Sequence, residues 1–417
     1  MAGIVQATWR WSMIREAQLR AAGRLAGDAV AAVVTTVQGV HRAVGRRVET
    51  ALPPVARGVA EIQSGLSDAV YAGVTQGGRL VPRIVAEVLV RCSPGAPALT
   101  ETSAGRHALA ALNGIWGDTI AERHPDLAVS ATLRAGGQDL RLHPAFVAEA
   151  VPEATGRIVV FVHGLSGSDR WWTGATAPNA QASYGERLSA DLGYVPLYVH
   201  YNSGRAVSDN GRDLAELLDR LVDVWPVPVE RMALIGHSMG GLVIRSACRH
   251  ADLADHRWIS TVGTVVTLGT PHLGAPLEKA VHVTERLLTV APETAPLARL
   301  LGIRSAGVKD LRFGALVPGD RRPDDPSLLA DRCTSVPVLP HVTYCFASAS
   351  IVRDARSPVG WLLGDGLVRL PSAAATGRTP REPLAPHRRA HFPGRHHVSL
   401  LNDPHVYAQL RQWLTDE

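Results

Sequence analysis

The sequence predicts an α/β protein with a mostly parallel β-sheet that is covered by helices on both faces. Apolar runs of strand length recur along the chain, and segments with helical periodicity lie between several of them. One run leads through a glycine-rich turn into a helical segment. With 417 residues, of which 46% are hydrophobic and 19% charged, the chain is long enough for such a core and an appendage.

The first hundred residues differ from the rest because their apolar side chains follow a helical period. Between residues 30 and 50 these side chains are spaced by three or four positions: Val33, Val37, Val40, Val44 and Val48. After Pro53 and Pro54 the spacing resumes as far as Val74, and a shorter apolar run covers residues 80–90. We therefore expect a helical appendage over residues 1–100 and a second domain over residues 101–417.

The net charge is concentrated in this appendage. Residues 1–100 hold 11 arginines against 6 acidic residues, and this difference equals the net charge of +5 of the whole chain. The charge is too dispersed for nucleic-acid binding. The predicted helices either pack on each other or on the second domain, or they rest on an anionic membrane surface.

Cysteines and hydropathy exclude other classes. No metal is expected, because histidines such as His387, His391 and His405 fit no metal site and the four cysteines lack zinc-binding spacing. These cysteines are Cys92, Cys248, Cys333 and Cys345. The longest uncharged apolar stretch near the start, residues 29–39, is too short to span a bilayer and has no signal cleavage site. We expect a cytoplasmic protein with reduced thiols, peripheral at the membrane if the appendage binds lipid.

The second domain is predicted to begin after a turn-rich linker at residues 93–105. Alternating apolar residues around an AGGQ turn predict a β-hairpin over residues 127–142. Buried strands are expected at residues 157–164, 195–202, 231–238, 264–271 and 341–348, with a helix over residues 211–225. Residues 272–340 interrupt this alternation and predict a cap or lid, or else a long structural connection.

The segment ALIGHSMGGLVIRSA, residues 233–247, combines a predicted strand, a tight turn and a predicted helix. This is the context of a G-x-S-x-G nucleophile elbow. Gly236 and Gly240 leave room for a strained turn that lifts Ser238 clear of the sheet. The start of the following helix favours a developing oxyanion.

A serine nucleophile needs a base and an orienting acid, and candidates follow it along the chain. Asp365 lies between glycines in a predicted loop, with Asp310 and Asp354 as alternatives for the acid. His396 and His397 stand directly before a predicted C-terminal helix, and either could be the base.

Several motifs in order resemble those of α/β-hydrolases, nearest the bacterial lipase and GPI inositol-deacylase-like group. The motifs are FVHGLSG, GHSMG at residues 236–240, TLGTPHLGAP, GDGLV and a final H-x-x-L-L that begins at His397. The resemblance covers about residues 155–415 and implies an α/β-hydrolase fold. It further implies Ser238 as nucleophile, His397 as general base and then acid, and Asp365 as the group that orients His397.

The oxyanion of such a reaction needs two backbone donors. We expect these to be the N–H groups of Leu165 and Met239. His163 precedes the serine in the chain, so we expect it to organise the oxyanion loop and not to transfer protons. Trp171 and Trp172 either line the acyl pocket or pack in the core.

The predicted reaction is hydrolysis of a carboxylic ester through an acyl-enzyme, without a cofactor. The resemblance, the predicted cap and the appendage favour an apolar acyl ester or lipid as substrate. A thioesterase or amidase could use the same residues. A non-catalytic lipid-binding relative is a further alternative, although such a protein would have little reason to keep serine, acid and histidine in order.

Overall fold

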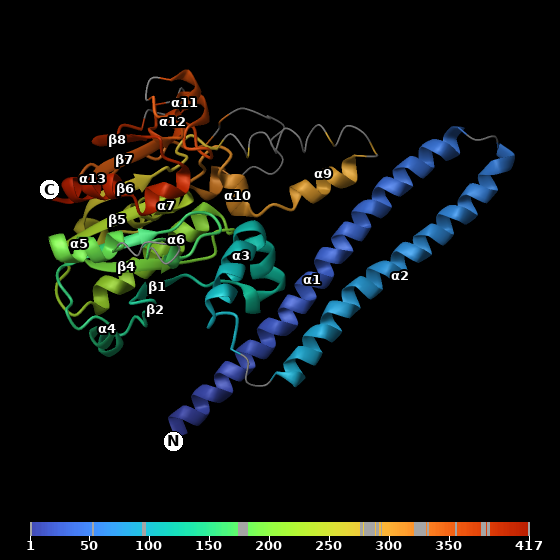
Figure 1. Cartoon of the computed structure of the whole chain (residues 1–417), viewed down its shortest axis with the longest axis horizontal. Coiled ribbons are helices and arrows are strands. Elements are labelled where there is room, and N and C mark those ends of the chain that lie inside the picture. Colours follow the sequence, from blue (N-terminus) through green and yellow to red (C-terminus); the bar gives the residue numbers. More distant parts are fainter. Residues whose placement is uncertain are drawn as a thin grey trace. The chain divides into compact units, whose positions relative to one another are not determined.

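The computed structural model describes the chain except residues 1, 52–53, 94–96, 174–181, 276–277, 279–287, 289–291, 293, 321–330, 332, 355–356, 377–380, 382–383 and 416–417. The chain forms two compact units (Figure 1). The helical unit comprises residues 1–109, 119–128 and 280–304, and the sheet unit comprises residues 110–118, 129–279 and 305–417.

Two long antiparallel helices, α1 (Ala2–Ala51) and α2 (Pro54–Cys92), make up most of the helical unit (Figure 1). Their close approach requires a small residue at Gly23, where a Cβ would lie 2.7 Å from the carbonyl oxygen of Pro82. Arg20 and Glu87 form an ion pair at 2.9 Å across the two helices. The unit also contains η1 (Pro125–Leu127), α9 (Ala295–Gly302) and both ends of α3 (Ser103–Arg123).

Helices are therefore present where the valine spacing predicts them. α1 begins earlier than the spacing indicates, and α2 continues through Pro82. In the described part of the chain, no helix combines the length and hydropathy needed to cross a membrane.

The sheet unit is built on eight strands in the spatial order β2-β1-β4-β3-β5-β6-β7-β8. The strands are β1 (Thr132–Ala135), β2 (Gln138–Asp139), β3 (Arg157–Val162), β4 (Val195–His200), β5 (Arg231–His237), β6 (Val262–Leu268), β7 (Thr343–Ser350) and β8 (Arg388–Pro393). β1 pairs antiparallel with β2 and β4, and the other neighbours pair parallel. The predicted hairpin and the five predicted strands are present, and the fold class is confirmed.

The sequence does not indicate β8. Its six residues are half-buried or exposed, and they include two arginines, a histidine and a proline instead of an apolar run. β8 pairs with β7 at the edge of the sheet, where one side of a strand has no neighbour. An edge strand of this kind carries little hydrophobic signal.

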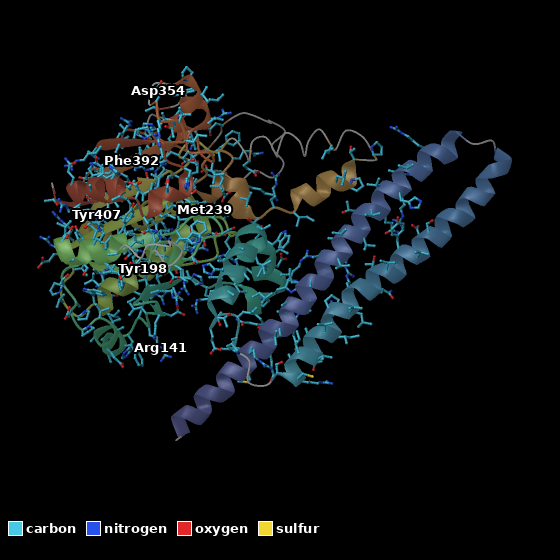
Figure 2. All side chains as sticks on the ribbon, viewed as in Figure 1. Arg141, Tyr198, Met239, Asp354, Phe392 and Tyr407 are labelled. Carbon is cyan, nitrogen blue, oxygen red and sulfur yellow. The ribbon has the colours of Figure 1, made fainter. Side chains whose placement is uncertain are left out.

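Helices cover both faces of the sheet, as predicted. Val160 of β3 belongs to one core with α6 (Val207–Val224) and α7 (Met239–Leu253), whereas Phe161 belongs to the other core with α5 (Tyr184–Leu192) and α13 (Pro404–Thr415). In Figure 2, Met239 marks the first core, and Tyr198 and Tyr407 mark the second. The remaining elements of the sheet unit are α4 (Pro144–Ala150), η2 (Asp169–Trp171), η3 (Arg257–Thr261), α10 (Ala306–Asp310), η4 (Pro318–Asp320), α11 (Pro358–Leu363), α12 (Leu370–Ala373) and η5 (His397–Leu401).

The predicted cap at residues 272–340 falls partly outside the described residues, which omit most of 276–293 and all of 321–330. Within this region, α9 belongs to the helical unit and α10 to the sheet unit. The cap stays a prediction, as does the domain boundary at residue 100.

Candidate active site

The predicted elbow joins β5 to α7 at a strained residue. Ser238 has φ 53° and ψ −125°, a left-handed conformation that is uncommon for a residue with a side chain. A Cβ at Gly240 would lie 2.2 Å from the carbonyl oxygen of Val162, and a Cβ at Gly236 would lie 2.5 Å from the backbone nitrogen of Gly241. The two glycines are therefore required by space, and they leave Ser238 partly exposed at the start of α7.

A second feature of the site is the contact between the carboxylate of Asp365 and the imidazole of His397. His397 Nδ1 donates to Asp365 Oδ2 at 2.7 Å, and the side chain of Asp365 is fully buried. The other carboxylate oxygen, Oδ1, accepts from the backbone N–H groups of Leu367 at 3.0 Å and Val368 at 2.8 Å. These bonds fix the carboxylate, and its bond to Nδ1 leaves Nε2 as the ring nitrogen available to a serine hydroxyl.

Ser238 and the Asp365–His397 pair lie close together at the carboxyl ends of β5 and β6. Ser238 donates its N–H to the carbonyl oxygen of Leu268 at 2.8 Å. The next residue, Gly269, has φ 60°, and a Cβ there would lie 3.1 Å from both Asp365 Oδ2 and His397 Nδ1. A side chain at Gly269 would intrude on the acid–imidazole pair, so this glycine also is required by space.

The residue before the serine contacts the candidate base directly. His237 Nε2 donates to the carbonyl oxygen of His397 at 3.1 Å, and the two rings lie 4.6 Å apart. Burial and the nearby His397 ring keep the pKa of His237 well below its usual value, so this ring is neutral. Among the described residues, no hydrogen bond joins the Ser238 hydroxyl to the His397 ring, a contact that in resting enzymes is often long and tightens with substrate.

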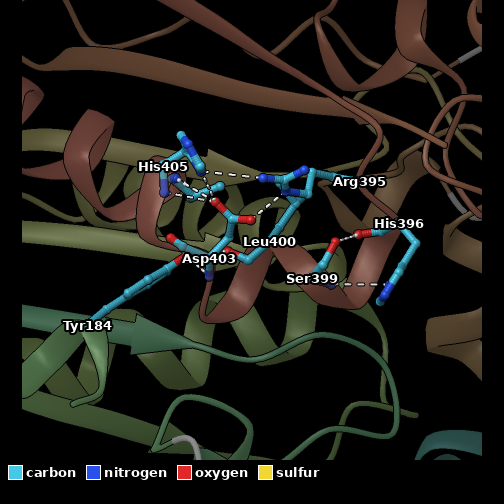
Figure 3. Close-up of polar contacts among 8 residues, drawn as sticks. Tyr184, Arg395, His396, Ser399, Leu400, Asp403 and His405 are labelled. Atoms are coloured by element: carbon cyan, nitrogen blue, oxygen red, sulfur yellow. Dashed lines mark hydrogen bonds and ion pairs between the residues drawn. The ribbon is translucent and has the colours of Figure 1, made fainter. Parts of the chain in front are cut away.

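The structure separates the alternatives from this pair. His396 is exposed, and its Nδ1 accepts from the backbone N–H of Ser399 at 3.3 Å (Figure 3). Asp310 Oδ2 accepts from the N–H of Val207 at 2.8 Å, so this side chain caps α6. Asp354 is exposed in the segment between β7 and α11. Of the candidates named from sequence, the structure brings together Asp365 and His397.

A clamp of polar groups, formed by Tyr184, Arg395 and Asp403, holds the segment that carries His397 (Figure 3). The Tyr184 hydroxyl of α5 lies 3.0 Å from the carbonyl oxygens of Leu400 and Asp403, and it accepts from the Asp403 N–H at 2.9 Å. The Asp403 carboxylate forms an ion pair with Arg395. Burial raises the pKa of Tyr184 far above its usual value, so the hydroxyl stays neutral. Residues 395–403 are therefore held at both ends.

The predicted oxyanion loop follows β3. His163 is buried, donates Nδ1–H to the carbonyl oxygen of Gly164 at 2.8 Å, and accepts at its own carbonyl oxygen from the Tyr201 hydroxyl at 2.7 Å. Burial lowers the pKa of His163 to about 3. A Cβ at Gly164 would lie 2.9 Å from the Cβ of Ser238, so the loop passes next to the serine. The backbone N–H groups of Leu165 and Met239, which are the expected oxyanion donors, form no hydrogen bond with any described residue.

An ion pair that sequence reasoning missed supports the far end of this loop. Arg134 of β1 donates Nη1–H to Asp169 Oδ2 at 2.7 Å, and both side chains are at most 9% exposed. Asp169 begins η2, directly after the loop. Neither residue stands in a recognisable motif, because the two are 35 positions apart in the chain.

The two tryptophans lie differently. Trp172 is buried and packs on Phe161, with ring centroids 4.9 Å apart, so it belongs to the core. Trp171 is partly exposed, and its carbonyl oxygen accepts from Asn402 Nδ2 at 3.2 Å. A Cβ at Gly167 would lie 3.2 Å from the Trp171 ring. Trp171 therefore connects the oxyanion loop to the segment after His397.

No group of three or more His, Cys, Asp or Glu side chains within the described ranges is arranged to hold a metal ion. His391 contacts Ser348 at 3.2 Å and Ser350 at 3.1 Å, and the Nδ1 of His387 accepts from the Tyr344 N–H at 3.1 Å. Both histidines thus have hydrogen-bonding roles at the β7–β8 edge.

Comparison with known proteins places this geometry in context. The sequence matches the family model of a PGAP1-like alpha/beta domain over residues 153–295. A triacylglycerol lipase of Burkholderia plantarii is 29% identical over 209 residues, which cover 49% of this chain and 52% of the lipase. The chain thus spans about half the length of this curated relative.

Two solved structures are among those that match this chain. The mature lipase BlEst2 of Bacillus licheniformis is 20% identical, with a TM-score of 0.39 over 69% of this chain and 97% of that one. An alpha/beta hydrolase fold protein from Chitinophaga pinensis is 10% identical, with a TM-score of 0.35 over 69% of this chain and 94% of that one.

The region matched by the family model contains β3, the oxyanion loop, the elbow and the turn after β6. A mostly parallel sheet with a strained serine between a strand and a helix is the arrangement of the α/β-hydrolase fold. The predicted resemblance is therefore confirmed. The chain has the fold class of the α/β-hydrolases, and its residues 153–295 are similar to the PGAP1-like alpha/beta domain.

Proposed function

We propose that the chain is a serine hydrolase of carboxylic esters, an esterase or lipase, and that Ser238, His397 and Asp365 form its catalytic triad. The observation that carries the proposal is the 2.7 Å bond between His397 Nδ1 and the buried Asp365, next to the strained Ser238. A carboxylate in this position selects the imidazole tautomer whose Nε2 can accept a proton, and it stabilises the imidazolium that forms.

In the first half-reaction, Ser238 Oγ attacks the ester carbonyl carbon while its proton passes to His397 Nε2. The carbonyl oxygen becomes an oxyanion that the N–H groups of Leu165 and Met239 stabilise. The intermediate then collapses. The bond to the alcohol oxygen breaks, this oxygen takes the proton from Nε2, and an acyl-enzyme remains.

In the second half-reaction, a water molecule replaces the alcohol. His397 Nε2 accepts one proton of this water as its oxygen attacks the acyl carbon. Collapse of the second tetrahedral intermediate returns the proton to Ser238 Oγ and releases the carboxylic acid. The cycle needs no cofactor, because every proton that leaves Ser238 or water is carried by the same imidazole.

We further propose that the substrate is an apolar acyl ester or lipid. The named activity of the Burkholderia plantarii relative supports a lipid ester. A lipid ester is met at a membrane or another lipid surface, so contact with such a surface through residues 1–100 is part of the proposal. Thioesters and amides are alternative substrates for the same three residues.

Labelling with a fluorophosphonate probe tests the mechanism. We expect the wild type to be labelled and Ser238→Ala to remain unlabelled, because the probe reacts only with an activated serine. Ser260→Ala is the matched control, since Ser260 is exposed on η3 and only donates to the Arg257 carbonyl oxygen. Equal labelling of wild type and Ser238→Ala would remove Ser238 from the mechanism.

Turnover of nitrophenyl esters with short and long acyl chains then tests the substrate class. A rate that rises with chain length supports a lipase, whereas a preference for acetyl or butyryl esters supports an esterase. Faster cleavage of matched thioesters or amides than of esters would contradict the ester assignment while leaving the serine mechanism intact.

A further inference from the structure

One side of α2 exposes a row of apolar side chains, with Gly77 and Gly78 between its two parts. These residues, called here the α2 apolar face, are Val70, Val74, Leu80, Val81, Ile84, Val85, Val88 and Leu89. Each is 45–59% exposed. At about 100° per residue they occupy about half of the helical circumference over a length of about 30 Å. Exposed apolar side chains that are contiguous, unlike single ones, mark an interaction surface.

The opposite side of α2 already packs against α1. Ala86 and Val90 are buried there, and Arg15 donates Nη2–H to the Val90 carbonyl oxygen at 2.9 Å. Glu87 pairs with Arg20 of α1. Hairpin packing therefore buries the other side of the helix, whereas the side chains of the α2 apolar face stay about half exposed.

Cations border this face. Arg83 is exposed and forms no ion pair with any described residue, and Arg91 is 76% exposed at the side chain. Glu87 at the same border is neutralised by Arg20 at 2.9 Å and by Arg91 at 3.2 Å. At the other end of the helix, Arg42 of α1 neutralises Asp68. The charge left over beside the apolar side chains is positive.

We propose that the α2 apolar face docks on an anionic lipid surface, with α2 lying in the plane of the interface. An apolar stripe that is edged by arginines is complementary to acyl chains beneath acidic headgroups. Docking of a second copy of the chain would bring two positively charged hairpins together, since residues 1–100 carry 11 arginines and 6 acidic residues. The inference does not depend on catalysis by Ser238.

Vesicle flotation with the full-length protein tests this docking. We expect the wild type to float with vesicles of phosphatidylcholine and phosphatidylglycerol, and to float less with phosphatidylcholine alone. Replacing Val81, Val85 and Val88 together by serine should lower the partition coefficient between water and vesicles at least about tenfold. Each substitution removes apolar surface that the lipid would otherwise bury. Arg83→Gln should reduce binding to the anionic vesicles by a smaller factor, about threefold, and raised salt should do the same.

A matched triple variant controls for a general loss of apolar surface. Phe146, Val227 and Leu253 are exposed apolar residues of the sheet unit, and their replacement by serine should leave flotation unchanged. Circular dichroism of each variant checks that the helices are retained. Flotation of the α2 variant at the wild-type level, or a wild type that fails to float, would overturn the proposal.

Sedimentation without lipid tests the competing occupant. We expect the wild type and the α2 variant to have the same mass. A wild-type dimer that the α2 substitutions dissociate would assign the face to self-association and overturn lipid docking. Because flotation and sedimentation involve no turnover, Ser238→Ala should behave like the wild type in both. A failure of this inference is therefore distinguishable from a failure of the proposed reaction.

Discussion

The serine side and the histidine side of the candidate site are held in different ways. At Ser238 the backbone does the positioning, through glycines that sit two residues before and after it and through the start of α7. At His397 the positioning comes from side chains of distant segments, namely Asp365, His237 and Tyr184. The first arrangement is contained in five consecutive residues, and the second exists only after the chain has folded. Substitutions on the serine side and on the histidine side test this difference.

The largest effect is expected on the backbone-positioned side. Gly240→Ala would place a Cβ 2.2 Å from the Val162 carbonyl oxygen, and neither backbone segment can move without disrupting the sheet. We expect a loss of about 3 kcal/mol or more in the free energy of unfolding and no fluorophosphonate labelling. Urea unfolding and labelling measure the two. Gly319→Ala should change neither, because a methyl group added at Gly319 would meet no other atom within 4 Å. A stable, fully labelled Gly240→Ala would show that the elbow tolerates more than the geometry allows.

On the side-chain-positioned side, His397→Ala should reduce kcat at least about a hundredfold, because no other described imidazole contacts Asp365. Nitrophenyl ester turnover gives the number. His396→Ala is the paired control and should be much milder, since that ring is exposed and only accepts from the Ser399 N–H. The reverse ranking would assign the base to His396.

A smaller effect is expected when the clamp is loosened and the base is kept. Tyr184→Phe removes the hydroxyl that contacts Leu400 and Asp403. We expect kcat to fall about tenfold with KM nearly unchanged, because a misplaced imidazole slows chemistry and not binding. Tyr407→Phe removes a hydroxyl that bonds Asp191 at 2.7 Å, so it should lose stability of about 1 kcal/mol but keep its kcat. Equal kcat values for the two variants would reduce the clamp to a structural role.

The smallest effect is expected on the free energy of unfolding when pH is changed, and it comes from His163 in the predicted oxyanion loop. The folded-state pKa of His163 is about 3, below its usual value of about 6.5. Between these values the unfolded chain binds more protons than the folded one, so stability falls as pH falls below about 6.5. The loss approaches about 1.4 kcal/mol per pH unit for this group. Urea unfolding between about pH 7 and pH 5 measures the slope. His163→Asn should lower the slope by this amount, and the part that comes from the other buried histidines, His237 and His272, should remain.

The same contrast explains what the sequence could predict. The elbow, the hairpin and the strands from β3 to β7 were open to prediction because glycine spacing and apolar runs are local signals. Order in the chain favoured Asp365 and the histidine pair, and the resemblance in the H-x-x-L-L ending favoured His397 over its neighbour His396. The structure adds the contact between His397 and Asp365. The positioning roles of Tyr184 and Arg134 were not predicted, because a tyrosine in a helix and an arginine in a strand carry no distinctive sequence pattern. β8 escaped because an edge strand with half-exposed residues has no apolar run.

The bond from His237 to the His397 carbonyl has a mechanical consequence. The residue in front of Ser238 holds the main chain of His397, although His237 and His397 are separated by 160 positions. The elbow and the histidine segment are thus tied together, and neither can swing outward alone without breaking that bond. Any motion that opens a path to Ser238 while this bond is kept must therefore involve other segments of the chain.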